Sequence, residues 1–134
     1  MIKVHNIGLI CLIETRVKFN KADKIRTCII PDWAYAYNYD QHFLGRICIC
    51  WKKSMFEVIV LDKSNQSINC VNKDIKDNLC WCHSFIYGDN KGMDRKILWD
   101  NLVSMKARVN NQPWMICGDF NVVKSLSEKW GLIN

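Results

Sequence analysis

The residues best able to do chemistry are an aspartate and an asparagine near the end of the chain. Asp119 and Asn121 follow the apolar run of residues 114–117 and are two positions apart, so on a strand their side chains would share one side. Gly118 has no side chain and would let a ligand approach the backbone. Far earlier, Glu14 closes another apolar run. Two carboxylates and a carboxamide suit Mg²⁺, which takes oxygen ligands and usually needs one or two protein carboxylates.

Hydrophobic periodicity predicts the elements that must position these residues. Residues 7–13 are almost continuously apolar, which is typical of a strand buried on both faces. Residues 21–28 predict a short helix that Pro31 stops. A period of two then predicts a strand over residues 33–39 with an aromatic face. The next strands are expected at residues 46–51, 56–61, 67–71 and 79–87. Short polar turns between them predict an antiparallel meander of four or five strands.

The pattern changes to a helical period after Gly92. Asp94 is a candidate N-cap, and four apolar residues recur at helical spacing after it. These are Leu98, Leu102, Met105 and Val109. The strand at residues 114–117 follows this helix, so part of the sheet is connected by a crossover. The sequence therefore predicts an α/β (α+β) sandwich with mixed, largely antiparallel sheets.

Composition limits the class of protein. A chain of 134 residues forms one domain comfortably, and the net charge of +6 is compatible with a polyanion such as nucleic acid. The sequence has no block of five or six like charges, so its net positive charge only weakly supports a nucleic-acid partner. The longest apolar run, residues 7–13, is too short to cross a bilayer and is not followed by a cleavage site. We therefore expect an intracellular protein in a reducing compartment, without a membrane or obligate protein partner.

The sequence contains eight cysteines, most of them inside apolar runs where cysteine acts as a small buried hydrophobe. In a reducing compartment they are expected to be free thiols. Cys48 with Cys50, and Cys80-Trp81-Cys82-His83, leave zinc as an alternative. The members of each cysteine pair are separated by one residue inside a predicted strand, whereas zinc ligands are usually separated by two to four at a turn.

Several motifs occur in a fixed order along the chain. They are Glu14-Thr15-Arg16, Gly45-Arg46-Ile47, Phe85-Ile86-Tyr87-Gly88-Asp89-Asn90, Arg95 with Leu98-Trp99 and Leu102, and Pro113 to Asn121. In this order and spacing the chain resembles the endonuclease/exonuclease/phosphatase superfamily. More narrowly, it resembles the apurinic-endonuclease-like nuclease domain of plant LINE-type (non-LTR) retrotransposons. The resemblance runs from Ile7 to about Gly131 and implies a partial four-layer sandwich.

The resemblance implies a role for five residues in Mg²⁺-dependent hydrolysis of DNA, with Mn²⁺ as an alternative ion. Glu14 would bind the metal, and Asp119 would orient or deprotonate the attacking water close to the metal. Tyr87 would contact the scissile phosphate through its hydroxyl. Asn90 would help to hold the site, and Asn121 would bind a phosphate oxygen. Such groups lower the barrier because phosphodiester hydrolysis concentrates negative charge on the phosphoryl oxygens.

The chain departs from the family pattern at both ends. A Trp-Asn-x-x-Gly motif does not precede Ile7, and the closing Ser-Asp-His motif is absent. Neither His42 nor His83 lies in such a context. Residues 1–134 are therefore expected to form a single, incomplete domain whose hydrolytic activity is weak or absent. A complete retrotransposon nuclease of this kind would act in the nucleus.

Two other functions remain open. The first is a non-catalytic nucleic-acid-binding module that uses the basic surface and the aromatic strand. The second is a cysteine-rich structural domain that holds zinc. Each candidate residue also has a simpler interpretation: Glu14 as a solvated strand end, Asp119 as a turn former, and the tyrosines as a packing face.

Overall fold

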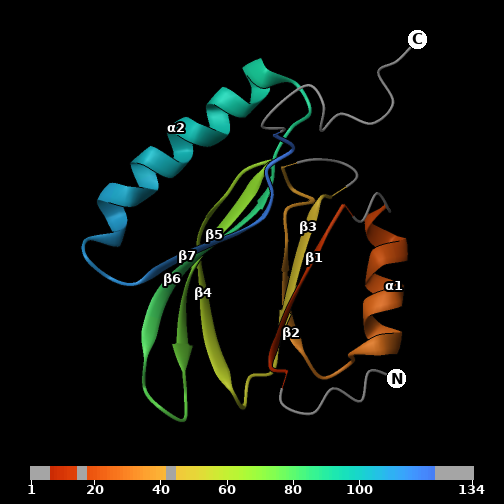
Figure 1. Ribbon diagram of the computed structural model, residues 1–134. Helices are drawn as coiled ribbons and strands as arrows, with labels where there is room; N and C mark the ends of the chain where they lie inside the picture. The colour runs from red at the N-terminus through yellow and green to blue at the C-terminus, as the bar shows by residue number, and fades with distance from the viewer. Residues whose placement is uncertain (1–6, 15–17, 42–44, 123–134) are drawn as a thin grey trace.

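The computed structural model describes residues 7–14, 18–41 and 45–122, and Figure 1 shows the arrangement of their helices and strands. The elements in chain order are β1 (Leu9–Ile13), α1 (Phe19–Ile29), β2 (Ala34–Tyr37), β3 (Ile47–Trp51), β4 (Phe56–Lys63), β5 (Ser67–Asp74), β6 (Cys80–Tyr87), α2 (Gly92–Val109) and β7 (Trp114–Asp119). Every predicted element is present, with ends shifted by a few residues. In the described part of the chain, no helix is both long and apolar enough to cross a membrane.

The strands form two sheets. The first has the order β1-β3-β2 and is entirely antiparallel. The second has the order β4-β5-β6-β7, in which β6 and β7 are parallel because α2 connects them. The prediction of one meander of four or five strands was therefore wrong. Only β4, β5 and β6 form a meander, because β2 and β3 pair with β1 instead.

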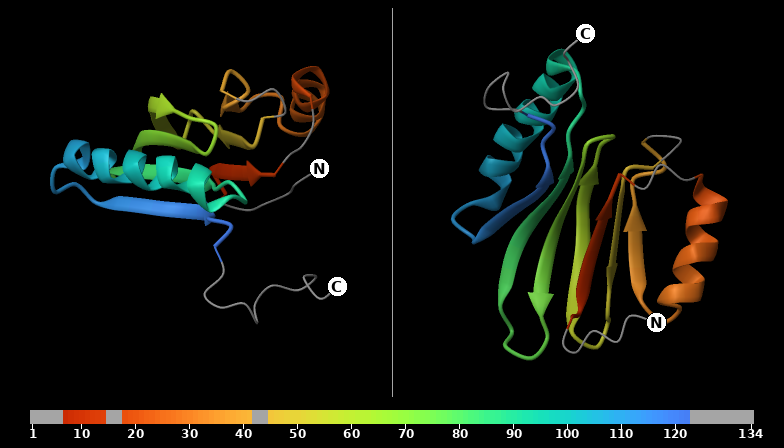
Figure 2. Two further views of the ribbon diagram at one scale, coloured as in Figure 1. Left: turned by 90° about the horizontal axis from the view of Figure 1, so that it is seen from above. Right: turned by 45° about the vertical axis from the view of Figure 1, so that its right-hand side comes forward.

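The main core lies between the two sheets. Alternation along each strand directs every second side chain inward, and the buried members come from β3, β5 and β6. They are Ile47, Ile49, Ile68, Cys70, Phe85 and Tyr87. Inward side chains of β1, β2, β4 and β7 pack around this cluster. Figure 2 shows the two sheets face to face in two further views.

Helix α1 covers the outer face of the first sheet. The ring of Phe19 meets the rings of Tyr37 and Tyr39 edge-on, at centroid distances of 5.7 and 5.5 Å. Tyr37 is buried against Cys48 and Cys50. Most of the aromatic strand is therefore a packing face, while Tyr35 is 43% exposed and lies under the guanidinium of Arg26. This strand therefore has little exposed aromatic surface on which nucleic-acid bases could stack.

Helix α2 covers the outer face of the second sheet with its predicted apolar stripe. Leu98 and Leu102 pack against Ile86, and Met105 and Val109 pack against Cys82. The layer order α1, sheet, sheet, α2 confirms the α/β sandwich (Figure 1). The predicted N-cap was wrong, because the helix begins at Gly92 and its N-cap residue is Lys91 instead of Asp94.

Candidate active site at the ends of three strands

The site begins where the parallel strands β6 and β7 end. Tyr87 is paired with Asp119 in the ladder, and the N–H of Gly88 donates to the carbonyl of Asp119 at 2.7 Å. The carboxyl ends of parallel strands meet at the same edge of a sheet. The register therefore brings the phenol and the carboxylate to one edge.

Gly118 makes the pairing of these strands possible. It has a φ of +139°, and a Cβ atom placed there would lie 1.9 Å from the carbonyl oxygen of Ile86. Any side chain would collide with the neighbouring backbone and would be strained as well. We predicted that Gly118 lets a ligand approach, but the close approach in the structure is that of strand β6.

Asp119 and Asn121 are brought together by a turn. β7 ends at Asp119, and Asn121 has a φ of +49°, so the expectation that both share a strand face was wrong. The backbone N–H of Asn121 donates to Oδ1 of Asp119 at 2.8 Å, while Nδ2 of Asn121 donates to the carbonyl of Gly88 at 2.6 Å. Between them, Phe120 stacks on Trp99 of α2 at 5.7 Å. The segment is fixed on both sides, and the carboxylate of Asp119 lies on the surface.

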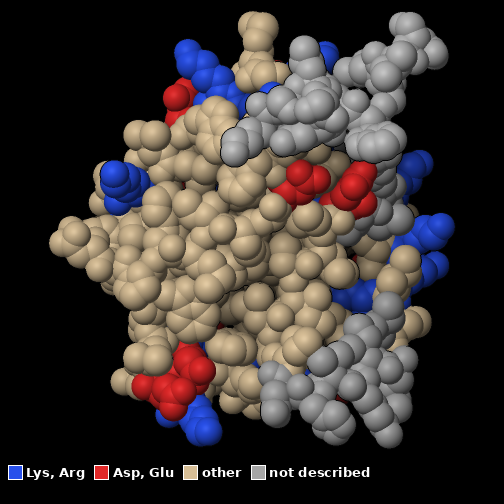
Figure 3. Space-filling view, viewed as in Figure 1, with Lys and Arg blue, Asp and Glu red and all other residues tan. Residues whose placement is uncertain are grey.

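Glu14 belongs to the other sheet and reaches the same end of the molecule. It is exposed, directly follows β1, and donates its backbone N–H to the carbonyl of Arg46 at 2.8 Å. The guanidinium of Arg46 bonds to Asp89 at 2.8 Å and lies 5.7 Å from the centre of the Tyr87 ring. Glu14 is thereby linked to Tyr87, the ladder partner of Asp119. Acidic side chains are visible on this face near the ends of β1 and β7 (Figure 3).

Gln66, a buried residue that was not identified from the sequence, supports the part of the site that belongs to the second sheet. Gln66 is 1% exposed and lies in the turn between β4 and β5. Its backbone carbonyl accepts from the N–H of Tyr87 at 2.9 Å, and its side-chain Oε1 accepts from the N–H of Asp89 at 2.8 Å. Its Nε2 donates to the carbonyl of Asp94 at 2.9 Å. One side chain thus fixes the end of β6 to the first turn of α2.

A second buried amide, Asn38, holds the first sheet's part. It is fully buried, and its Oδ1 accepts from the N–H groups of Arg46 and Ile47, both at 2.9 Å. Its Nδ2 donates to the carbonyls of Ser64 and Asn65 at 3.2 and 3.3 Å. The only sequence signal for either amide is a polar residue at the border of an apolar run. That signal is weak because turns use the same residue types.

Asn90, the remaining predicted site residue, and the histidines have other environments. Asn90 is exposed, and its carbonyl accepts from Nη1 of Arg95 at 2.7 Å. His83 is buried between Asn72 at 3.3 Å and the thiol of Cys117 at 3.0 Å, and burial lowers its pKa to about 4. His83 is therefore neutral at pH 7 and lies within the core. His42 lies outside the described residues.

The cysteines are free thiols, as predicted. The sulfur atoms of Cys48 and Cys50 lie 3.6 Å apart, and both residues are buried on the face of the first sheet that α1 covers. Cys82 is buried against α2, whereas Cys80 is exposed. Within residues 7–14, 18–41 and 45–122, no three histidine, cysteine or acidic side chains are grouped so that they could hold a metal.

The donors at the strand ends fit a hard cation better than zinc. Glu14 and Asp119 supply exposed carboxylates, and the nearby thiol of Cys117 faces the core instead. Oxygen ligands with remaining water positions are the preference of Mg²⁺, whereas structural zinc takes four cysteine or histidine ligands. The residues present are therefore compatible with Mg²⁺ held by two carboxylates and water.

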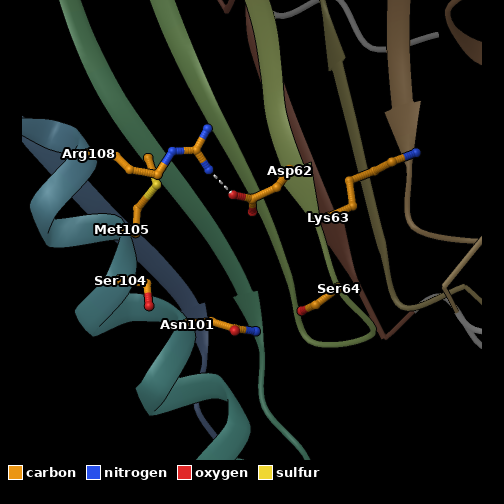
Figure 4. A pocket seen from close by; sticks show the side chains of 7 residues that line it. All are labelled: Asp62, Lys63, Ser64, Asn101, Ser104, Met105 and Arg108. Carbon is orange, nitrogen blue, oxygen red and sulfur yellow. Dashed lines mark hydrogen bonds and ion pairs between the residues drawn. The ribbon is translucent and has the colours of Figure 1, made fainter.

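A separate cleft of about 220 Å³ lies between β4 and α2. Seven residues line it: Asp62, Lys63, Ser64, Asn101, Ser104, Met105 and Arg108. Arg108 forms an ion pair with Asp62 across the cleft, while Lys63 points away from it (Figure 4). The cleft contains none of the predicted site residues.

The fold is similar to that of a known catalytic domain. The chain is similar to the catalytic domain of human nocturnin, whose structure contains a bound sulfate anion, with a TM-score of 0.58 and 15% sequence identity. The similarity covers 86% of this chain and 52% of that one, so the chain spans about half of the nocturnin chain. No family model matches the chain. A search of curated proteins found no match.

Proposed function

We propose that this chain forms part of the active site of a metal-dependent DNA phosphodiesterase, related to the endonucleases of plant LINE-type retrotransposons. The observation that carries the proposal is the convergence of three strand ends from two sheets. Glu14 is linked through Arg46 to Tyr87, and Tyr87 is paired with Asp119. The fold shared with the nocturnin catalytic domain supports a catalytic function.

The residues would divide the work of phosphodiester hydrolysis. Glu14 and Asp119 would hold Mg²⁺ or Mn²⁺, which when bound supplies Lewis-acid stabilisation of the charge on the phosphoryl oxygens. Oδ1 of Asp119 already accepts the N–H of Asn121, and this bond orients the carboxylate so that Oδ2 can accept a proton from water. The water oxygen bonds to phosphorus, the bond to the leaving oxygen breaks, and that oxygen takes a proton from solvent.

Two further groups would contact the phosphate. The ring of Tyr87 is packed in the core at 8% exposure, which fixes the direction of its hydroxyl. A fixed O–H donor stabilises developing negative charge without reorganisation. Nδ2 of Asn121 has one N–H engaged with Gly88, which leaves its second N–H for a phosphate oxygen.

Metal binding tests the proposal directly. We expect Mn²⁺, followed by electron paramagnetic resonance of the free ion, to bind the chain at one site. Glu14→Gln and Asp119→Asn should each weaken binding about tenfold or more, because each removes a carboxylate ligand. Asp100→Asn makes the same change of charge on the exposed side of α2 and should leave affinity unchanged. Equal affinities in all four proteins would overturn the assignment.

Supercoiled-plasmid relaxation in Mg²⁺ tests the chemistry. We expect slow nicking at most, because the family's Ser-Asp-His motif is absent from the sequence and His83 is buried. Any nicking should require Mg²⁺ and should disappear in Asp119→Ala. Rapid nicking that Asp119→Ala abolishes would support the function and contradict the expected weakness. Nicking that survives the substitution would exclude Asp119 from the reaction.

A further inference from the structure

The two carboxylates of the proposed site belong to different sheets, so strand pairing does not fix their separation. Glu14 follows β1 of the first sheet, and Asp119 ends β7 of the second. The sheets are joined mainly by apolar contacts between inward side chains. Such contacts are non-directional and tolerate sliding better than hydrogen bonds do. A metal site shared between the sheets therefore needs a directional contact near it.

Arg46 provides such a contact. Its carbonyl accepts the N–H of Glu14 at 2.8 Å, so its backbone moves with the end of β1. Its side chain crosses to the second sheet, where Nη1 lies 2.8 Å from Oδ1 of Asp89. The guanidinium is also 5.7 Å from the centre of the Tyr87 ring, within the range of a cation–π interaction.

Both ends of the bridge are anchored by buried amides. Asn38 accepts the N–H of Arg46, and Gln66 accepts the N–H of Asp89. Asn38 also donates to the carbonyls of Ser64 and Asn65, the two residues before Gln66. The same short turn therefore supports Arg46 on one side and Asp89 on the other.

Both side chains of this ion pair are shielded from solvent. Arg46 and Asp89 are 22% and 19% exposed, whereas the acidic partner is at least 40% exposed in the pairs Arg26–Asp23, Lys63–Asp40 and Arg108–Asp62. A pair that is partly shielded from solvent is held more firmly in one geometry than a surface pair. Arg46 and Asp89 are thus suited to fix a position as well as to attract each other.

We propose that the Arg46–Asp89 ion pair positions the site by holding Glu14 of the first sheet in register with Tyr87 and Asp119 of the second. This inference rests on the proposed metal-dependent function of the same site. Arg46 acts through Glu14 and Tyr87, and it is a positioning residue, without a role in the chemical step.

A charge-matched double variant separates position from charge. Arg46→Met alone would leave Asp89 unpaired and would make the region more negative, which by itself favours a cation. The double variant Arg46→Met/Asp89→Asn keeps the local net charge and removes only the bridge. The control Arg108→Met/Asp62→Asn removes an Arg–Asp pair of the same kind between α2 and β4, beside the cleft of Figure 4.

Mn²⁺ affinity, measured by electron paramagnetic resonance, is the readout. We expect the site double variant to bind Mn²⁺ about tenfold more weakly than the unaltered chain, and the control double variant to bind within about twofold. The single variant Arg46→Lys keeps a cation opposite Asp89 and should retain most of the Mn²⁺ affinity of the unaltered chain. A purely structural ion pair would lower the melting temperature of the double variant and leave the affinity of the folded protein unchanged.

The outcomes separate the two proposals. If Glu14→Gln and Asp119→Asn weaken Mn²⁺ binding while Arg46→Met/Asp89→Asn does not, the positioning role is wrong and the metal site stands. If neither carboxylate variant changes Mn²⁺ binding, the proposed function fails first. Should the double variant not fold, as judged by near-ultraviolet circular dichroism, Asp89→Asn provides the test. Because the loss of a negative charge by itself weakens cation binding, this variant is compared with Asp89→Glu, which keeps the charge and changes only the reach of the carboxylate. Asp89→Glu is expected to weaken binding severalfold, and unchanged affinity in Asp89→Glu would overturn the inference.

Discussion

Tyr87 lies directly opposite Asp119 in the parallel ladder between β6 and β7. The N–H of Gly88 then donates to the carbonyl of Asp119, and the side chain of Asn121 donates to the carbonyl of Gly88. The segments after the two strands are thus joined by two hydrogen bonds. This junction gives the candidate site its fixed side.

Gly118→Ala should destabilise the chain strongly. The new Cβ would be placed 1.9 Å from the carbonyl of Ile86, at a φ of +139° that side chains rarely adopt. We expect a loss of about 3 kcal/mol or more in the free energy of unfolding, measured by urea denaturation. Gly92→Ala is the matched control, because its Cβ would come no closer than 3.7 Å to the side chain of Arg95. The control should be neutral or slightly stabilising.

Gln66→Leu should damage both stability and the site. Leucine has a similar volume, but it leaves the N–H of Asp89 and the carbonyl of Asp94 without their present partner. We expect a loss of about 2–4 kcal/mol in the free energy of unfolding. Gln112→Leu, which alters an exposed glutamine with a weak thiol contact, should change stability much less. Equal effects of the two substitutions would contradict the role of Gln66.

His83 should make the chain less stable at mildly acidic pH. Burial lowers its pKa from 6.5 to about 4, so the folded state keeps it neutral while the unfolded chain takes up a proton below pH 6.5. The stabilisation is complete above pH 6.5 and is lost progressively as the pH falls to about 4. The expected loss is about 2–3 kcal/mol. Urea denaturation at several pH values should give a flatter dependence for His83→Gln, and an unchanged dependence would assign the effect elsewhere.

The cysteines should react with Ellman's reagent in two groups. Cys28 and Cys80 are exposed, whereas Cys50 and Cys70 are at most 1% exposed. Burial also raises the pKa of Cys70 to about 12, which suppresses the reactive thiolate. Two thiols per folded chain should react rapidly, and the other six, which are buried or half-buried, should react much more slowly. The double variant Cys28→Ser/Cys80→Ser should lose the rapid phase, and a persistent rapid phase would show that the buried thiols are accessible.

Local patterns were sufficient to predict the elements. The stripe of Leu98, Leu102, Met105 and Val109 predicted α2, and the same residues are buried against the second sheet. Alternation also predicted the strands, because a side chain's face depends only on its parity along the strand. The division into two sheets was not predictable in this way, since parity does not specify which strand pairs with which.

The residues of the candidate site were proposed from the sequence, but their geometry was not predictable. Glu14, Tyr87, Asp119 and Asn121 were proposed for it, whereas the turn that joins Asp119 to Asn121 was mistaken for a continuous strand. The supporting residues Asn38 and Gln66 carried only a weak sequence signal, and Asp89 was noted only as part of a motif. Their importance comes from hydrogen bonds to residues distant in the chain.

The sequence by itself determined which segments become helix or strand, which side chains face inward, and which polar groups are available for chemistry. These properties follow from periodicity and residue type, which act over a few neighbouring positions. The tertiary structure alone decided that Glu14 and Asp119 reach the same end of the sandwich through Arg46 and Tyr87. That convergence depends on strand pairing and sheet packing between distant segments, which no local pattern specifies.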